Sequence, residues 1–182
     1  MNQKNTNLVW VDLEMTGLNP DSDRIIELAC LITDESLNIV AEGPEMVISQ
    51  PESVLTAMDK WNTQHHTESG LVEKVRGSNI SEAAAEVRLL DFVKQHTTER
   101  TAPLCGNSIW QDRRFLTRYM PAFEGWLHYR VIDVSTIKEL AGRWYPGLSK
   151  YQKEKSHTAM SDIRESIGEL RYYQSHIFVP SI

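Results

Sequence analysis

Residues 8–20 read Leu-Val-Trp-Val-Asp-Leu-Glu-Met-Thr-Gly-Leu-Asn-Pro. The first eight are mostly apolar and the last five favour a turn, so the segment predicts a strand followed by a turn. Asp12 and Glu14 lie two residues apart, and side chains alternate across a strand, so both carboxylates point to the same face. The apolar neighbours indicate a central strand, whereas an edge strand with a solvated face is the alternative. Burying two adjacent carboxylates is costly, so the central position requires positive charge between them.

The rest of the chain predicts strands and helices around this segment. Further strands are expected at 25–33, 37–49, 103–108 and 129–132. Helices are expected around 54–58 and 63–69, from Asn79 (the cap) to 96, from 111 to 119 with a stop at Pro121, and from Asp133 to about 142–146. The last helix is the clearest, because its apolar residues recur every three to four positions: Met160, Ile163, Ile167, Leu170, Tyr173 and Ile177. Three early strands followed by alternating helices and strands indicate one three-layer α/β domain, residues 1–182, with a mixed five-stranded sheet.

Composition narrows the class of protein. The 182 residues are 41% hydrophobic and 24% charged, which is typical of a soluble globular domain and argues against disorder. No run of 18 apolar residues occurs, so no membrane span is predicted. Cys30 and Cys105 are the only cysteines, which excludes a disulfide framework and a cysteine-based zinc site. This cysteine usage, and the polar first residues, favour a cytoplasmic protein.

Charge is unevenly distributed along the chain. The formal net charge of −6 divides into −9 for residues 1–100, +4 for 101–155 and −1 for 156–182. Proteins that hold long nucleic acids through many phosphate contacts are usually basic, so binding of a long duplex is not expected. A short anionic ligand could still bind near the one basic segment.

Two more acids and a histidine complete a candidate catalytic set. Asp112 lies just after a predicted strand; alone, it is best explained as a favourable charge at a helix N-terminus, worth about 0.3–1 kcal/mol. Asp162 lies beside the apolar stripe of the last helix, from which it can reach the first strand. The apolar pattern of that helix begins after His157, which is in a position where a lone histidine is usually structural or exposed.

Taken together, the four acids match the needs of two divalent cations. Four carboxylates carry −4, and two Mg²⁺ or Mn²⁺ ions carry +4 and prefer oxygen ligands. A two-metal site supports phosphodiester cleavage, and a neutral histidine nearby can accept a proton from water.

These residues resemble the three motifs of the DEDDh family of 3′-to-5′ exonucleases. The motif residues are Asp12-x-Glu14, Asp112 and His157-x-x-x-x-Asp162. Longer strings are similar to the branch of that family that acts on very short RNA: residues 10–18, 23–27, 41–44, 61–62, 66–71, 105–108, 111–115, 119–121, 133–136 and 162–166. The resemblance implies a ribonuclease H-like fold and metal-dependent degradation of short single-stranded RNA to 5′-mononucleotides.

The resemblance also implies roles for particular residues. The metal ligands would be Asp12, Glu14, Asp112 and Asp162, and His157 would be the general base. Leu18 would wedge against the bases, Trp61 would stack near them, and His66 would lie by the substrate. Ser108, Arg130, Ser135 and Thr136 would cap the 5′ end of a dinucleotide. Tyr129 would reach the active site of the partner subunit in a homodimer.

Two departures from the family pattern and three alternatives remain at this point. Ser161 stands where the family often has a second acid, and Trp110 stands where a small residue is expected. Asp12-Leu-Glu-Met-Thr16 also resembles the nucleophile motif of haloacid dehalogenase-type phosphatases, although Glu14 departs from it. A non-catalytic RNA-binding module is the second alternative. The third is a related exonuclease that trims longer RNA ends or proofreads DNA, which should have more basic surface.

Overall fold

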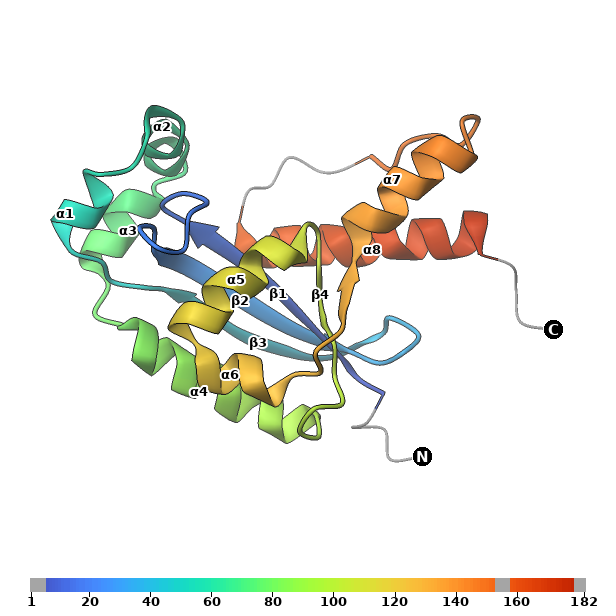
Figure 1. Cartoon of the computed structure of the whole chain (residues 1–182), viewed down its shortest axis with the longest axis horizontal. Helices are drawn as coiled ribbons and strands as arrows, with labels where there is room; N and C mark the ends of the chain where they lie inside the picture. The colour runs from blue at the N-terminus through green and yellow to red at the C-terminus, as the bar shows by residue number, and fades with distance from the viewer. Residues whose placement is uncertain (1–5, 153–157, 179–182) are drawn as a thin grey trace.

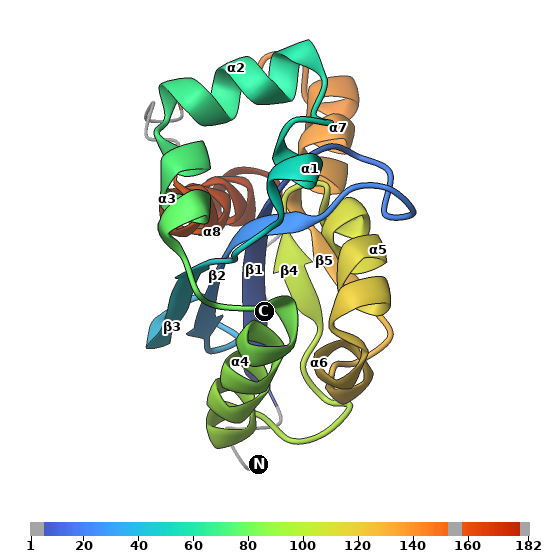
Figure 2. The same ribbon diagram turned by 90° about the vertical axis from the view of Figure 1, so that its left-hand side faces the viewer.

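A computed structural model describes residues 6–152 and 158–178, which form a sheet between two layers of helices (Figures 1 and 2). The strands are β1 (Leu8–Met15), β2 (Ile25–Thr33), β3 (Ile39–Val47), β4 (Leu104–Gly106) and β5 (Val131–Asp133). The helices are α1 (Glu52–Leu55), α2 (Lys60–Glu68), α3 (Leu71–Gly77), α4 (Glu82–His96), α5 (Ile109–Tyr119), α6 (Pro121–Trp126), α7 (Val134–Trp144) and α8 (Ala159–Ile177).

The sheet has the order β3-β2-β1-β4-β5, so β1 is its central strand as the sequence predicts. β1 is antiparallel to β2, and β2 to β3, whereas β1, β4 and β5 are parallel. The predicted mixed five-stranded sheet is therefore confirmed, and the alternative of a solvated edge strand for β1 is wrong.

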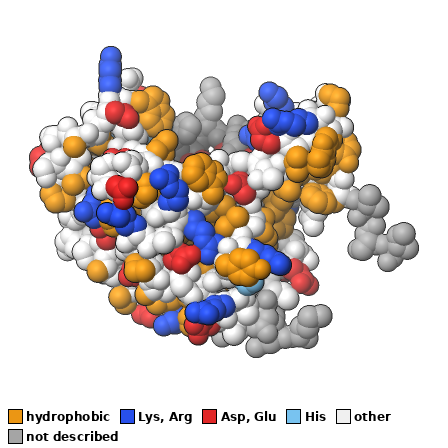
Figure 3. Space-filling model, viewed as in Figure 1, with side chains coloured by type: hydrophobic (Ala, Val, Ile, Leu, Met, Phe, Trp, Pro, Cys, Tyr) orange, Lys and Arg blue, Asp and Glu red, His pale blue; other side chains and the backbone are white. Residues whose placement is uncertain are grey.

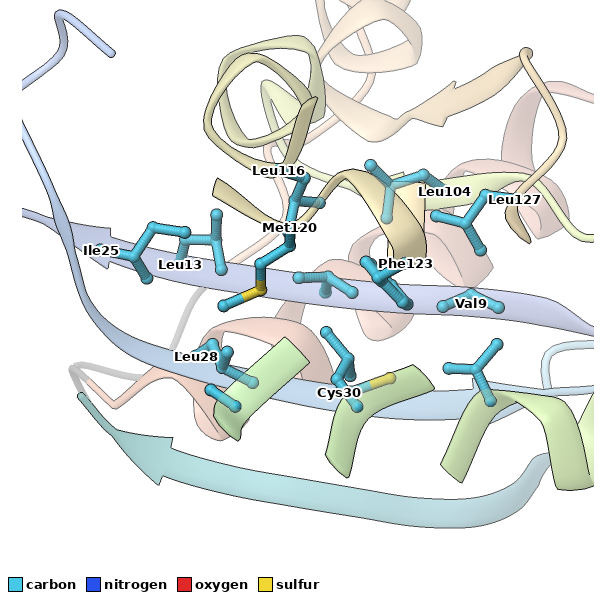
Figure 4. Close-up of a cluster of buried hydrophobic side chains, with 14 of the residues drawn as sticks. Val9, Leu13, Ile25, Leu28, Cys30, Leu104, Leu116, Met120, Phe123 and Leu127 are labelled. Carbon is cyan, nitrogen blue, oxygen red and sulfur yellow. The ribbon is translucent and has the colours of Figure 1, made fainter. Parts of the chain in front are cut away.

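The two faces of β1 pack against different helices. Val9, Val11 and Leu13 face a core that α4, α5 and α6 cover, drawn in Figure 4. Trp10 faces the opposite way, toward Ile163 and Ile167 of α8. Asp12 and Glu14 follow Trp10 with the same alternation, so the face that carries both acids is the face covered by α8.

Three local expectations need correction. Helix α4 begins two residues later than predicted, because the side chain of Ser81, not Asn79, accepts the N–H of Ala84 and caps it. Helix α3 was not expected from the pattern of residues 53–76. Pro121 does not only stop α5: it starts α6, where proline at the first helical position removes no hydrogen bond and fixes a helical φ.

The parallel strands bring distant loops to one edge of the sheet. Trp10 pairs with Cys105, and Gly106 pairs with Asp133, so the carboxyl ends of β1, β4 and β5 all point to the same edge of the sheet. Open α/β sheets bind ligands at such carboxyl ends. No helix in the described ranges has the length and apolar character needed to cross a membrane.

Candidate active site

Three of the predicted metal ligands meet on the α8 face of β1. Asp12, Glu14 and Asp162 each offer an oxygen, and these atoms lie within 4.8 Å of one another. Asp162 is in the first turn of α8, which packs along the central strands, and the start of α8 lies beside the arrowhead of β1 in Figure 1. The predicted reach of Asp162 toward the first strand is therefore confirmed.

Asp112 joins this cluster from another helix. β4 is short and pairs with β1 only at Val9 and Trp10, so the first turn of α5 lies against the second half of β1. There Asp112 Oδ1 accepts a hydrogen bond from the backbone N–H of Leu13 at 3.1 Å. The charge of Asp112 is close enough to raise the pKa of Asp12. Asp112 is thus a buried member of the site and not a solvated helix-terminal charge.

The cluster is electrostatically unfavourable without cations. Burial, together with the charges of Asp112, Glu14 and Asp162, raises the pKa of Asp12 well above its ordinary value. Burial and the charge of Glu27 raise the pKa of Glu14 to about 7. Burial raises the pKa of Asp112 to about 8. An all-oxygen set of buried, mutually repelling carboxylates fits hard divalent cations such as Mg²⁺ or Mn²⁺.

The predicted general base, His157, lies outside the described residues. Its chain neighbour Thr158 is the N-cap of α8: the Thr158 side chain accepts the N–H of Ser161, and Ser161 Oγ accepts the N–H of Thr158. Ser161, the departure from the family pattern, therefore completes the helix cap. This cap fixes where α8 begins and hence where Asp162 lies.

The two side chains predicted to contact the bases are available to a ligand. Leu18 is 69% exposed in the loop after β1, and Trp61 is 67% exposed on α2. Trp61 stacks on the ring of His65, with centroids 4.9 Å apart. His66 is buried instead, and its Nε2 lies 2.9 Å from the carbonyl oxygen of Met15. His66 therefore supports the end of β1, next to Glu14.

Three of the four predicted cap residues line one pocket. Ser108, Ser135 and Thr136 lie on a pocket of about 410 Å³, together with Trp110 and Arg143. Arg130 is not among its lining residues. Trp110 is 58% exposed and forms one wall, so its bulk shapes the pocket and does not fill the carboxylate cluster.

Tyr129 and Arg130 lie far from the carboxylates of their own chain. They precede β5, at the amino ends of the parallel strands, whereas Glu14 lies near the carboxyl end of β1. Tyr129 is 73% exposed and stacks on His128. Arg113 donates hydrogen bonds to the carbonyl oxygens of 128, 129 and 130 and pairs with Glu124. Arg113 therefore holds this segment in place.

Sequence reasoning missed two supporting residues. Gln111 donates to the carbonyl oxygen of Leu18 at 2.6 Å and so fixes the loop that carries the Leu18 side chain. Glu27 pairs with Glu14 across β1 and β2, is buried, and accepts the backbone N–H of Ala159 at the start of α8. A carboxylate in the middle of an apolar strand was the available signal for Glu27; nothing in the sequence distinguished Gln111 from a surface helix residue.

Comparison with known proteins agrees with this geometry. The sequence profile of the family described as "Exonuclease" matches residues 9–170. The oligoribonuclease of Alkalilimnicola ehrlichii is 59% identical over 171 residues, which cover 93% of this chain and 89% of that protein. The oligoribonuclease of Thiobacillus denitrificans is 58% identical, and the match covers 94% of both chains.

The chain belongs to the oligoribonuclease family of exonucleases. It is therefore a metal-dependent nuclease, and the phosphatase alternative is excluded.

Solved structures support the fold of this oligoribonuclease family member. An exonuclease I from Methylocaldum szegediense aligns with a TM-score of 0.72 at 18% identity, and a product-bound exonuclease I aligns with 0.71 at 17%. The matches cover 94% and 93% of this chain, but only 41% and 43% of the exonuclease I chains. The likeness therefore shows the ribonuclease H-like exonuclease fold, as predicted.

Proposed function

We propose that this chain is a 3′-to-5′ exoribonuclease that hydrolyses RNA of two to about five nucleotides to 5′-mononucleotides. The observation that carries the proposal is the meeting of Asp12, Glu14 and Asp162 within 4.8 Å, with Asp112 beside them, on the central strand of an exonuclease fold. The names of the relatives, which are oligoribonucleases, support the short substrate. Residues 1–182 form one exonuclease domain in this proposal, and two free, buried cysteines fit a cytoplasmic enzyme.

Each part of the site has a task in the proposed reaction. The four carboxylates hold two divalent cations, Mg²⁺ or Mn²⁺, which would activate water and stabilise the leaving 3′ oxygen. His157 takes the proton from the attacking water. Leu18 wedges against the bases and Trp61 stacks near them, and stacking of a base on an aromatic ring supplies about 1–3 kcal/mol without reading sequence. The pocket lined by Ser108, Ser135 and Thr136 receives the 5′ end.

The charge distribution predicts a preference for short RNA over long RNA. Residues 1–100 carry −9, so a long polyanion meets repulsion outside the basic segment. A dinucleotide needs only the cations, the stacking side chains and one 5′ contact. We therefore expect kcat/KM to fall as RNA lengthens from two to twenty nucleotides, at moderate salt and with Mn²⁺ or Mg²⁺. Labelled RNAs resolved by gel electrophoresis or chromatography measure this directly.

The same panel separates the remaining alternatives. Equal efficiency on a twenty-nucleotide RNA would contradict the short-substrate proposal and favour an exonuclease that trims long ends. Absence of any hydrolysis in the presence of cations would favour the non-catalytic binding module. A DNA panel of matched lengths tests the proofreading alternative.

The position of Tyr129 supports a homodimer with shared active sites. Tyr129 lies at the end of the sheet opposite Glu14, so it cannot serve the carboxylates of its own chain. Its ring is exposed, and Arg113 holds the backbone that carries it, so Tyr129 is suited to a partner surface. Exposed aromatic side chains also occur on α7 and after it, including Trp144 and Tyr145, and Figure 3 shows apolar side chains gathered there.

Subunit mixing tests the shared site. We expect Tyr129→Ala and Asp112→Asn to be inactive separately and to regain activity when mixed. In a heterodimer, the Tyr129→Ala subunit keeps its four carboxylates and receives an intact Tyr129 from the other chain. One site per heterodimer is then complete. No recovery, with subunit exchange demonstrated by differently tagged chains, would show that Tyr129 does not act in trans.

A further inference from the structure

A chain of hydrogen bonds joins the cap pocket to the helix that carries Asp162. Asn107 lies at its centre, between the end of β4 and Ser108. Its Oδ1 accepts the Ser135 hydroxyl at 3.0 Å, and its Nδ2 donates to Ser166 Oγ at 2.7 Å. Ser166 in turn donates to the carbonyl oxygen of Asp162 at 2.8 Å. The cap and the metal-ligand helix thus contact each other through one side-chain amide.

Buried partners on α8 fix the orientation of this amide. Asn107 Nδ2 also faces Glu169 Oε2 at 3.4 Å, and Glu169 is 1% exposed and pairs with Lys138. A carboxylate accepts hydrogen bonds, so the amide must turn its NH₂ group toward α8 and its oxygen toward Ser135. The Ser166 hydroxyl gives its hydrogen to Asp162, which leaves its oxygen to accept from Asn107. Every donor and acceptor along this path is therefore matched.

On the cap side, the path ends at a strained residue. Ser108 has φ of 51°, a left-handed conformation that is unfavourable for a residue other than glycine. Its N–H points at Asp133 Oδ1 and at Ser135 Oγ, 3.0 and 2.9 Å away. The Ser135 hydroxyl can accept this N–H because its own hydrogen is directed to Asn107. Asn107 thereby sets the direction of Ser135, and Ser135 holds Ser108.

We propose that Asn107 is a positioning residue that fixes the distance between the 5′ cap and the carboxylate cluster, and that this fixed distance selects dinucleotides. The inference rests on the proposed function, because it uses the cap of Ser108 and Ser135. A dinucleotide can reach both the cap and the cations only if the cap and the carboxylate cluster are held one particular distance apart. A longer RNA extends past the cap and gains nothing from that separation. Loss of the Asn107 bridge should therefore penalise the shortest substrate selectively.

The test compares two substrates of the same enzyme. For Asn107→Ala, we expect kcat/KM on a 5′-phosphorylated dinucleotide to fall about 5- to 20-fold, mainly through KM, because two partnered polar groups lose their bonds. Activity on a pentanucleotide should change less than about twofold. In a Ser135→Ala background, Asn107→Ala should lower kcat/KM on the dinucleotide by less than about a further twofold, since Asn107 acts through Ser135. Tyr173→Phe is the matched control: it removes another hydroxyl near Glu169 and should leave the ratio of dinucleotide to pentanucleotide activity unchanged.

Several results would overturn the proposal. An unchanged ratio of dinucleotide to pentanucleotide activity in folded Asn107→Ala would do so. The proposal would also fail if Asn107→Ala lowered dinucleotide activity as much in the Ser135→Ala background as in the wild type. Should Asn107→Ala fail to fold, as judged by thermal unfolding, Ser166→Ala removes the acceptor on α8 and must lower the same ratio. A wild-type enzyme without dinucleotide preference would contradict the proposed function itself. A wild-type preference that both variants keep would contradict only the role of Asn107.

Discussion

Replacing Asp112 with Asn is expected to lower hydrolysis by at least about 10³-fold at saturating Mn²⁺. Lewis-acid stabilisation by a bound cation is worth several kcal/mol, and each 1.4 kcal/mol is a factor of ten in rate. The fold should persist, because the amide oxygen of the substituted side chain can still accept the N–H of Leu13. Single-turnover hydrolysis of a dinucleotide is the measurement. Asp91→Asn, on the exposed surface of α4, is the matched control and should keep full activity.

The same substitution should stabilise the metal-free protein at alkaline pH. Asp112 and Glu14 have pKa values of about 8 and about 7 in the folded state, above the values of about 4 expected after unfolding. Between about pH 4 and 8 the folded protein therefore binds more protons, and its free energy of unfolding falls as pH rises. Asp112→Asn removes one of these groups, so the free energy of unfolding of the variant should decrease less as pH rises. Tm in EDTA from pH 5 to 8.5 should decline more steeply for the wild type, and parallel curves would contradict the electrostatic account.

His157→Ala is expected to reduce turnover by about 10²–10⁴-fold, the usual contribution of a positioned base. The acidic limb of the pH–rate profile should disappear with it, because an ordinary histidine is protonated below about pH 6.5 and cannot then accept a proton. His157 lies outside the described residues, so this prediction rests on the motif and on its spacing from Asp162. Measuring kcat against pH with a dinucleotide tests it.

The control for this variant is another histidine near the same helix. His176→Gln, on the exposed last turn of α8, should keep both the rate and the profile. Mn²⁺ binding by His157→Ala should remain close to wild type, which separates proton transfer from metal binding. An acidic limb that persists in His157→Ala would show that another group takes the proton.

The central strand and its acids could be predicted because their signals are local. Alternation along 8–15 was enough to place Asp12 and Glu14 on one face, and the spacing of apolar residues was enough to place Asp162 on the side of α8 that meets it. The position of β1 in the middle of the sheet followed from its apolar neighbours. These features depend on residues within one strand or one helix.

Other parts of the site depend on contacts between distant segments. Asp112 alone favoured a helix-terminal charge, and only the short pairing of β4 with β1 brings it to Leu13. The role of Asn107 requires β4, α7 and α8 to be in place together. The sequence around Arg113 is compatible with a solvated or phosphate-binding side chain, yet its partners are backbone carbonyls that follow α6. No periodic pattern encodes such long-range bonds.

Mn²⁺ binding to the metal-free protein tests the central claim most directly. Isothermal titration calorimetry at pH 7, in two buffers of different ionisation enthalpy, measures both the number of ions and the protons released. The ligand carboxylates must be ionised to bind cations, and the pKa values of Glu14 and Asp112, about 7 and about 8, leave protons on them in the metal-free site. The account predicts two ions per chain with net proton release in the wild type, and weaker binding with less proton release in Asp112→Asn. Identical titrations for the two proteins, or binding without proton release in the wild type, would contradict a site built from these four carboxylates.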